Sequence, residues 1–313
     1  MTAILVILVH LAFALAITPV LIGVMRTVRA RLEGRSGGGI GQPWRDVLKL
    51  LAKEPLRAPG STLVLSAAPV LLMASSLVLS ALVPLVSTLA LPSVPGDLFV
   101  VVSVLLLGTV ALALLGLESG TAFGGMGSSR HMVIAALVEP TVLLSIYAIS
   151  GPVGSSVLSV IVAARSADPA SLLNPVSLLA IVALGVVVIA ETGRLPVDNP
   201  STHLELTMVH EAMILESGGR DLGWLEFGSW LRLTALLGLV ANLAVPFGVA
   251  PDASLVGLLV GVATGAVKLL LAGALLAAVE VFLAKLRLFR VPELLAGSFV
   301  LAFLSVSAAY LVF

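Results

Sequence analysis

The chain has 313 residues, of which 59% are hydrophobic and only 11% are charged. A soluble domain carries about 25% charged residues, so this composition excludes an ordinary soluble protein and predicts an all-α, polytopic integral membrane protein. The formal net charge is zero and cysteine is absent, so nothing indicates a nucleic-acid partner, and the chain itself cannot form disulfides, thiolate metal sites or cysteine-ligated iron–sulfur clusters.

Eight apolar runs are long enough to cross a bilayer as transmembrane helices. They cover residues 3–25, 62–90, 98–117, 131–150, 174–192, 229–249, 254–284 and 294–313. The apolar segment 152–163 is too short to span, and we expect it to be a re-entrant or interfacial piece on the outer side. All residues from 1 to 313 are expected to form a single membrane domain, with cytoplasmic loops at 26–60 and 193–228.

Arginine and lysine predict the orientation, because cytoplasmic loops are enriched in both. Loop 26–60 carries eight of the 17 basic residues. If that loop is cytoplasmic, eight spans place 15 of the 17 on the same side, Arg232 among them, and leave out only Arg165 and Lys268. Both termini would then face outward.

The first cytoplasmic loop contains an amphipathic segment, 46–53, in which apolar and charged residues are interleaved as in a helix on a membrane surface. The basic residues around it either set the topology alone or form a docking platform for a soluble partner. The candidate docking residues are Arg35, Arg45, Asp46, Lys49 and, in a later loop, Arg130.

Several ionisable residues fall inside or at the ends of spans. Glu139 and Lys268 lie mid-span, Glu280 follows Lys268 by 12 residues, and Glu118 and Glu191 lie at inner span ends. A charge at bilayer depth costs roughly 2.5–3.5 kcal/mol, so it usually faces a partner or water. Two interpretations remain open: structural placement, at the interface or in an ion pair between helices, and a proton relay.

The stretch 191–219 concentrates charge between two apolar runs. Asn199 and Pro200 predict a helix start, and Gly218 with Gly219 predicts its end. Such a helix carries two polar stripes, which suit a buried polar cavity. One stripe contains His203 and His210, and the nearly opposite one contains Glu205 and Glu216. The histidines are seven residues apart with no HExxH motif, so we expect no metal site.

Four motifs in the chain resemble those of the complex I subunit 1 family. ETGRLPVD, residues 191–198, is similar to the loop between the family's fifth and sixth helices, with Val197 in place of phenylalanine. RSGGGIGQPWRDVLKL, residues 35–50, looks like the family's first loop, with Gly38 where proline is usual. The stretch 116–140 is similar to a third family segment, and Lys268 and Glu280 match the family's late-helix lysine and glutamate.

Within that family, the pattern GLxxGxxFxxxGxSR at residues 116–130 is closer to the membrane subunits of group 4 [NiFe]-hydrogenases and formate hydrogenlyase, the hydrogenase-4 component C type. After Asp198, Ser201 and His203 stand where the family carries acids. This departure makes quinone chemistry in this chain less expected.

The resemblance implies a membrane-anchor and energy-coupling subunit in a prokaryotic cell membrane. Its implied partners are a hydrogenase-like large subunit and an iron–sulfur small subunit on the cytoplasmic side, which hold the [NiFe] and iron–sulfur clusters, and Mrp antiporter-like membrane subunits. The expected coupling or proton-relay residues are Glu118, Glu139, Glu191, Glu205, Glu211, Glu216, Lys268, Glu280, His203 and His210. We expect Arg194 and Asp198 to clamp the loop that contains them.

Three alternatives remain. The chain could be the quinone-binding subunit of a respiratory NADH dehydrogenase, or a passive membrane anchor whose charges form structural ion pairs. A stand-alone transporter is disfavoured because the sequence has no internal repeat. The electron donor and acceptor, and the choice between proton and sodium, remain open.

Overall fold

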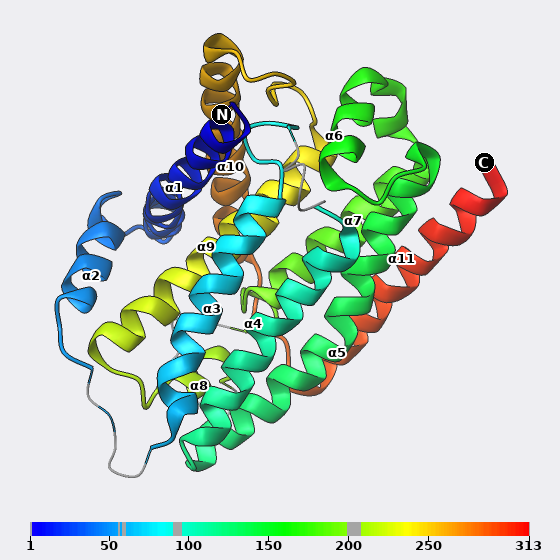
Figure 1. Cartoon of the computed structure of the whole chain (residues 1–313). Coiled ribbons are helices and arrows are strands. Elements are labelled where there is room, and N and C mark those ends of the chain that lie inside the picture. Colours follow the sequence, from blue (N-terminus) through cyan, green and yellow to red (C-terminus); the bar gives the residue numbers. More distant parts are fainter. Residues whose placement is uncertain (1, 56, 58–60, 90–95, 199–207, 313) are drawn as a thin grey trace.

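The computed structural model describes residues 2–55, 57, 61–89, 96–198 and 208–312. Within these ranges the chain forms eleven α-helices and three short 3-10 helices (Figure 1). The α-helices are α1 (Thr2–Leu32), α2 (Gln42–Leu51), α3 (Leu63–Leu82), α4 (Leu98–Glu118), α5 (Ala122–Ser150), α6 (Leu158–Ala167), α7 (Pro175–Glu191), α8 (His210–Ile214), α9 (Gly219–Ala244), α10 (Leu255–Phe282) and α11 (Val291–Val312). The predicted all-α class is confirmed.

Seven of the described helices are long and apolar enough to cross a membrane, namely α1, α3, α4, α5, α9, α10 and α11. A polytopic membrane protein is therefore confirmed. The remaining predicted span corresponds to α7, which has 17 residues and rises about 25 Å, somewhat less than the roughly 30 Å of a hydrocarbon core. This helix packs against α5 and α11 (Figure 1).

Several predicted span boundaries differ from the helix ends: α1 continues to Leu32 beyond the predicted end at 25, and α9 ends at Ala244 before the predicted end at 249. Three further differences have a local cause. α3 ends at Leu82 rather than near residue 90, because Pro84 cannot continue a helix. α5 begins at Ala122, nine residues before the predicted span, and Thr121 caps it by accepting a hydrogen bond from Gly124 N. α9 begins at Gly219, ten residues early. The first turns of α5 and α9 are polar or glycine-rich, so an apolar run does not include them.

The segments that connect the helices lie at two opposite ends of the bundle. Figure 1 shows both termini and α6 at one end, and α8 with the turn between α4 and α5 at the other. The predicted short outer piece is α6, a ten-residue helix. The amphipathic segment of the first loop is α2, whose Pro43 and Val47 are buried and which packs along the first turns of α9. We call the end that carries α2 and α8 the loop end.

The predicted helix over 199–216 is only partly within the described residues. Its expected start, Asn199 and Pro200, lies outside them, and α8 covers His210–Ile214. The expected end at the glycine pair was wrong, because α8 stops at Ile214 and Gly218 caps the following helix, α9. Gly219 has φ of +58°, and a Cβ there would lie 2.0 Å from the Glu54 carbonyl oxygen, so the chain turns into α9 against the segment after α2.

Candidate functional site

The loop Thr192–Asp198 begins with a tight helix end. The N–H of Arg194 donates to Ile189 O at 3.0 Å, and the N–H of Gly193, whose φ is +59°, donates to Ala190 O at 3.1 Å. This pair of bonds is a Schellman motif, which glycine favours because it has no Cβ to clash in the left-handed region. The glycine of the ETGR motif thus ends α7 directly after Glu191.

Asp198 ties the far end of this loop to two other segments. Its Oδ2 accepts hydrogen bonds from the N–H groups of Val209 at 3.2 Å and His210 at 3.1 Å. Its Oδ1 forms an ion pair of 3.2 Å with Lys285 Nζ, just beyond α10. The loop backbone is also bound there, since Leu286 N donates to Pro196 O at 2.9 Å.

The ion pairs of the described residues differ from the expected clamp between Arg194 and Asp198. Arg194 Nη1 lies 3.8 Å from Glu280 Oε1 in α10, while Asp198 pairs with Lys285. The side chains of both residues thus pair with the end of α10 or the segment after it, while a backbone hydrogen bond from Asp198 N to Arg194 O at 3.1 Å joins the two residues directly. Sequence proximity does not reveal these partners, because the α10 end is more than 80 positions away.

A buried ion pair lies directly behind the loop. Glu191, the last residue of α7, accepts a hydrogen bond from Arg232 Nη2 in α9, and their side chains are 2% and 6% exposed. The same Nη2 donates to Leu105 O at 2.8 Å and Thr109 Oγ1 at 2.7 Å. Thus three helices, α4, α7 and α9, contribute to one polar contact.

The topology argument counts Arg232 with the cytoplasmic basic residues, whereas the structure places it within a helix. Because α9 begins ten residues earlier than predicted, Arg232 lies 13 residues inside the helix and is buried. Its role as the partner of Glu191 was missed. The available signal was an arginine three residues inside an apolar run, which lies too deep for a solvated flank.

Glu139 and His131 of α5 lie next to this pair. Glu139 has Glu191 and Arg232 as electrostatic neighbours, and its Oε1 is buried without a hydrogen bond to any described residue. The Nε2 of His131 is likewise buried and unbonded within the described chain. His131, Glu191, Asp198 and His210 line a cavity of about 10 Å³, at the lower limit for one water molecule. The carboxylates of Glu191 and Asp198 therefore share one small cavity with the two histidines.

His210 begins α8 at the edge of this space. Its Nε2 lies 3.5 Å from Ser229 Oγ. Desolvation lowers the pKa of His210, although the nearby Asp198 carboxylate opposes that shift. The imidazole is thus held toward its neutral form beside a buried carboxylate.

A larger pocket, of about 680 Å³, lies at the loop end between α1, α9 and α10. Its ionisable lining residues are Arg26, Arg29, Glu33, Arg35, Arg194, Glu211, Glu226 and Glu280. The Arg194–Glu280 pair forms part of its wall, and Arg194 is three residues from Glu191. We call this pocket the charged cavity.

The remaining expected relay residues lie elsewhere. Glu118 accepts a hydrogen bond from Thr62 N at 2.6 Å at the loop-end surface, as the interfacial interpretation expects. Glu216 is exposed after α8. His203 and Glu205 lie outside the described residues.

Lys268, midway along α10, donates to Asn242 Oδ1 at 2.9 Å. Asn242 in turn donates to Pro84 O at 2.8 Å. No ion pair joins Lys268 to Glu139 in the part of the chain that the structure describes, so the interhelix pair expected under the structural interpretation is absent there.

The expected docking residues form two groups. Arg45 and Lys49 are exposed on α2, and Arg35, also exposed, pairs with Glu33. By contrast, Asp46 pairs with Arg26 at 3.1 Å, and Arg130 Nη1 donates to Met208 O at 3.1 Å. The latter two therefore hold the loop end together.

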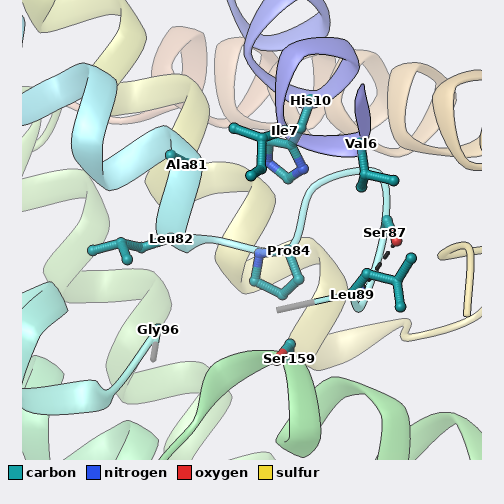
Figure 2. Close-up of a pocket in the computed structure, with 10 residues that line it drawn as sticks. All are labelled: Val6, Ile7, His10, Ala81, Leu82, Pro84, Ser87, Leu89, Gly96 and Ser159. Carbon is teal, nitrogen blue, oxygen red and sulfur yellow. Dashed lines mark hydrogen bonds between the residues drawn. The ribbon is translucent and has the colours of Figure 1, made fainter. Parts of the chain in front are cut away.

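No group of three or more potential metal ligands occurs among the described residues. At the end of the bundle that carries both termini, a cavity of about 30 Å³ lies where His10 points from α1 toward Pro84 (Figure 2). His10 Nε2 lies 2.9 Å from Ser80 O, so this histidine joins α1 to α3.

Comparison of the chain with known proteins identifies its family and its relatives. Residues 3–312 match the family described as NADH dehydrogenase. Two relatives from Escherichia coli (strain K12) are similar over most of the chain. Hydrogenase-4 component C is 33% identical over 257 residues, which are 82% of this chain and 80% of that protein. Formate hydrogenlyase subunit 4 is 30% identical over 291 residues, 93% of each chain.

Among solved structures, a chain of the membrane-bound sulfane sulfur reductase, an archaeal respiratory membrane complex, has the same fold. The TM-score is 0.86 at 21% identity, and the match covers 99% of this chain and 100% of that one. The resemblance to complex I subunit 1, and within it to the hydrogenase-4 component C type, is confirmed. The chain therefore belongs to the NADH dehydrogenase family, the family of complex I subunit 1.

Proposed function

We propose that this protein is the membrane-anchor and energy-coupling subunit of a hydrogenase-like respiratory complex. It binds a cytoplasmic electron-transfer module at the loop end and links a redox event there to proton or sodium movement through neighbouring membrane subunits. In this proposal α7 serves as an eighth span, which places both termini outside. The identities of the two Escherichia coli relatives and of the archaeal complex support membership in such an assembly.

One observation carries the coupling role: ionisable side chains lead from the charged cavity into the bundle. The Arg194–Glu280 pair is in the cavity wall, the Glu191–Arg232 pair is behind it, and Glu139 has that second pair as its electrostatic neighbours. Buried charges are costly unless paired. A passive anchor needs no such series, whereas a charge relay does.

The proposed mechanism is electrostatic. A change of charge in a docked redox partner alters the field in the charged cavity and shifts the balance between Arg194 and Glu280. The loop Thr192–Asp198 is bound to both α8 and the end of α10, so a change at one ion pair is transmitted to Glu191. Protonation of Glu139 then follows the state of the Glu191–Arg232 pair, because Coulomb interactions are strong where water is scarce.

The test is purification of the complex through a tag on this chain, followed by reconstitution into vesicles. We expect electron transfer between soluble substrates to drive ion uptake, and an uncoupler to accelerate turnover. Electron transfer with no ion uptake, and no response to the uncoupler, would leave the passive anchor as the function. Reduction of an added quinone that is blocked by inhibitors of quinone sites would instead support the quinone-binding alternative.

A further inference from the structure

A second large pocket lies at the end of the bundle that carries both termini and α6, opposite the loop end (Figure 1). It has a volume of about 590 Å³ and is enclosed by the end of α5, by α6 and by the start of α7. Its lining includes Arg165, Asp168, Ala170 and Ser177. None of these residues takes part in the proposed coupling.

Arg165 brings a buried positive charge to this pocket. The residue is 3% exposed, its Nε donates to Leu243 O at 3.0 Å, and its Nη1 donates to Ser177 Oγ at 2.9 Å. Its Nη2 is buried and has no hydrogen-bond partner among the described residues. No carboxylate of those residues lies within ion-pair distance of this guanidinium. A buried cation without a counter-ion is costly, so the site favours an anionic group.

An adjoining pocket of about 320 Å³ has a different chemistry. It shares Ala148 and Pro152 with the first pocket and is otherwise lined by Tyr147, Gly151, Val306, Ala309 and Tyr310. The two tyrosine hydroxyls lie 2.7 Å apart. Tyrosine is enriched at membrane–water interfaces, and the small apolar lining suits an acyl chain. Two pockets with common walls, one holding a buried guanidinium and the other none, match the two parts of one lipid.

We propose that these two pockets bind one phospholipid, with its phosphate on Arg165 and an acyl chain beside Tyr147 and Tyr310. Ser177 Oγ donates to Ser171 O at 2.8 Å, so this side chain positions the guanidinium and does not bind the phosphate. A free phosphate ion would use only the first pocket. Asp168 is exposed at the rim, where its Oδ1 accepts from Ala170 N at 3.2 Å. A carboxylate there favours a headgroup that carries an amine, so phosphatidylethanolamine should bind more tightly than phosphatidylglycerol.

The experiment uses the full chain in mild detergent, stripped of lipid and then titrated with phosphatidylethanolamine, phosphatidylglycerol or inorganic phosphate while bound lipid is counted by native mass spectrometry. Ala170→Trp fills the first pocket without replacing the guanidinium. Ala167→Trp, on an exposed residue that does not line either pocket, is the matched control. Arg165→Gln removes the charge.

We expect one phosphatidylethanolamine per wild-type or Ala167→Trp chain, and binding weaker by roughly tenfold or more in Ala170→Trp and Arg165→Gln, as for the loss of a charge-assisted hydrogen bond. Equal lipid binding by Ala170→Trp and its control would overturn the proposal, even if Arg165→Gln failed to fold. Stabilisation by inorganic phosphate without lipid binding would also overturn it. Arg165 would then serve only to cap the carbonyl end of α9.

Discussion

At the scale of single residues, the Glu191–Arg232 pair governs the inner part of the site. Replacing Arg232 by Met leaves the Glu191 carboxylate buried without its cation, which should cost about 3–5 kcal/mol of unfolding free energy. The double variant Glu191→Leu with Arg232→Met removes both charges and should recover most of that loss. Thermal unfolding in one detergent would compare the variants. If Arg232→Met unfolds at the wild-type temperature, the ion pair does not contribute to the free energy of unfolding.

His210 should make the stability of the folded chain depend on pH, in a direction that its pKa shift defines. Its pKa is lowered in the folded chain, so the unfolded chain binds more protons near and below its usual pKa of about 6.5. Stability should therefore fall as the pH drops below about 6.5, and the Gln variant of His210 should lose that part of the slope. Thermal unfolding at a series of pH values would measure it. Parallel curves for the two proteins would contradict the predicted role.

At the scale of elements, Gly127 of α5 lets α8 and the residue before it approach closely. A Cβ at Gly127 would lie 2.9 Å from both Ala212 Cβ and Val209 O, while a Cβ at Gly125 would meet nothing within 4 Å. Gly127→Ala should thus destabilise the chain by about 1–3 kcal/mol, whereas Gly125→Ala should raise stability by up to about 1 kcal/mol. Denaturation of the two variants side by side tests this contact. Equal shifts would show that α8 does not pack on Gly127.

The same elements show what the sequence can and cannot predict. α7 and α10 were predicted to within two residues, because their apolar runs end where their helices end. The early starts of α5 and α9 were missed, because their first turns are polar or glycine-rich and so fall outside the apolar runs. Glu139 was singled out by its mid-span position, and Glu191 by the charged stretch that it begins. Their relation to Arg232 could not be, because it depends on how α5, α7 and α9 pack.

At the scale of the whole molecule, orientation can be tested directly because the chain has no cysteine. Ser36 and Asp252 are exposed at opposite ends of the bundle. A maleimide that cannot cross the membrane should label Ser36→Cys only from the cytoplasm and Asp252→Cys only from outside. Labelling with the sides exchanged would place the loop end, and the proposed docking surface, on the wrong side.

Docking of the soluble module depends on the exposed basic face of α2. Reversing both Arg45 and Lys49 to Glu should release the module from membranes at moderate salt, because attraction between charged surfaces is screened as ionic strength rises. The control is Arg290→Glu, an exposed charge at the loop end outside α2. Sedimentation of the module with membranes measures retention. If the α2 variant retains the module fully, the basic residues of α2 serve only to set the membrane topology.

The central claim is that buried carboxylates couple electron transfer to ion movement, and Glu139→Gln tests it most directly. The substitution keeps the size of the side chain and removes only its titration, and Glu139 Oε1 has no hydrogen bond to lose within the described residues. The exposed Glu293→Gln is the control. The measurement is ion uptake per electron transferred in vesicles containing the whole complex. We predict that Glu139→Gln retains assembly and electron transfer but loses most of its ion uptake, while the control keeps the wild-type ratio. An unchanged ratio in Glu139→Gln would contradict the account.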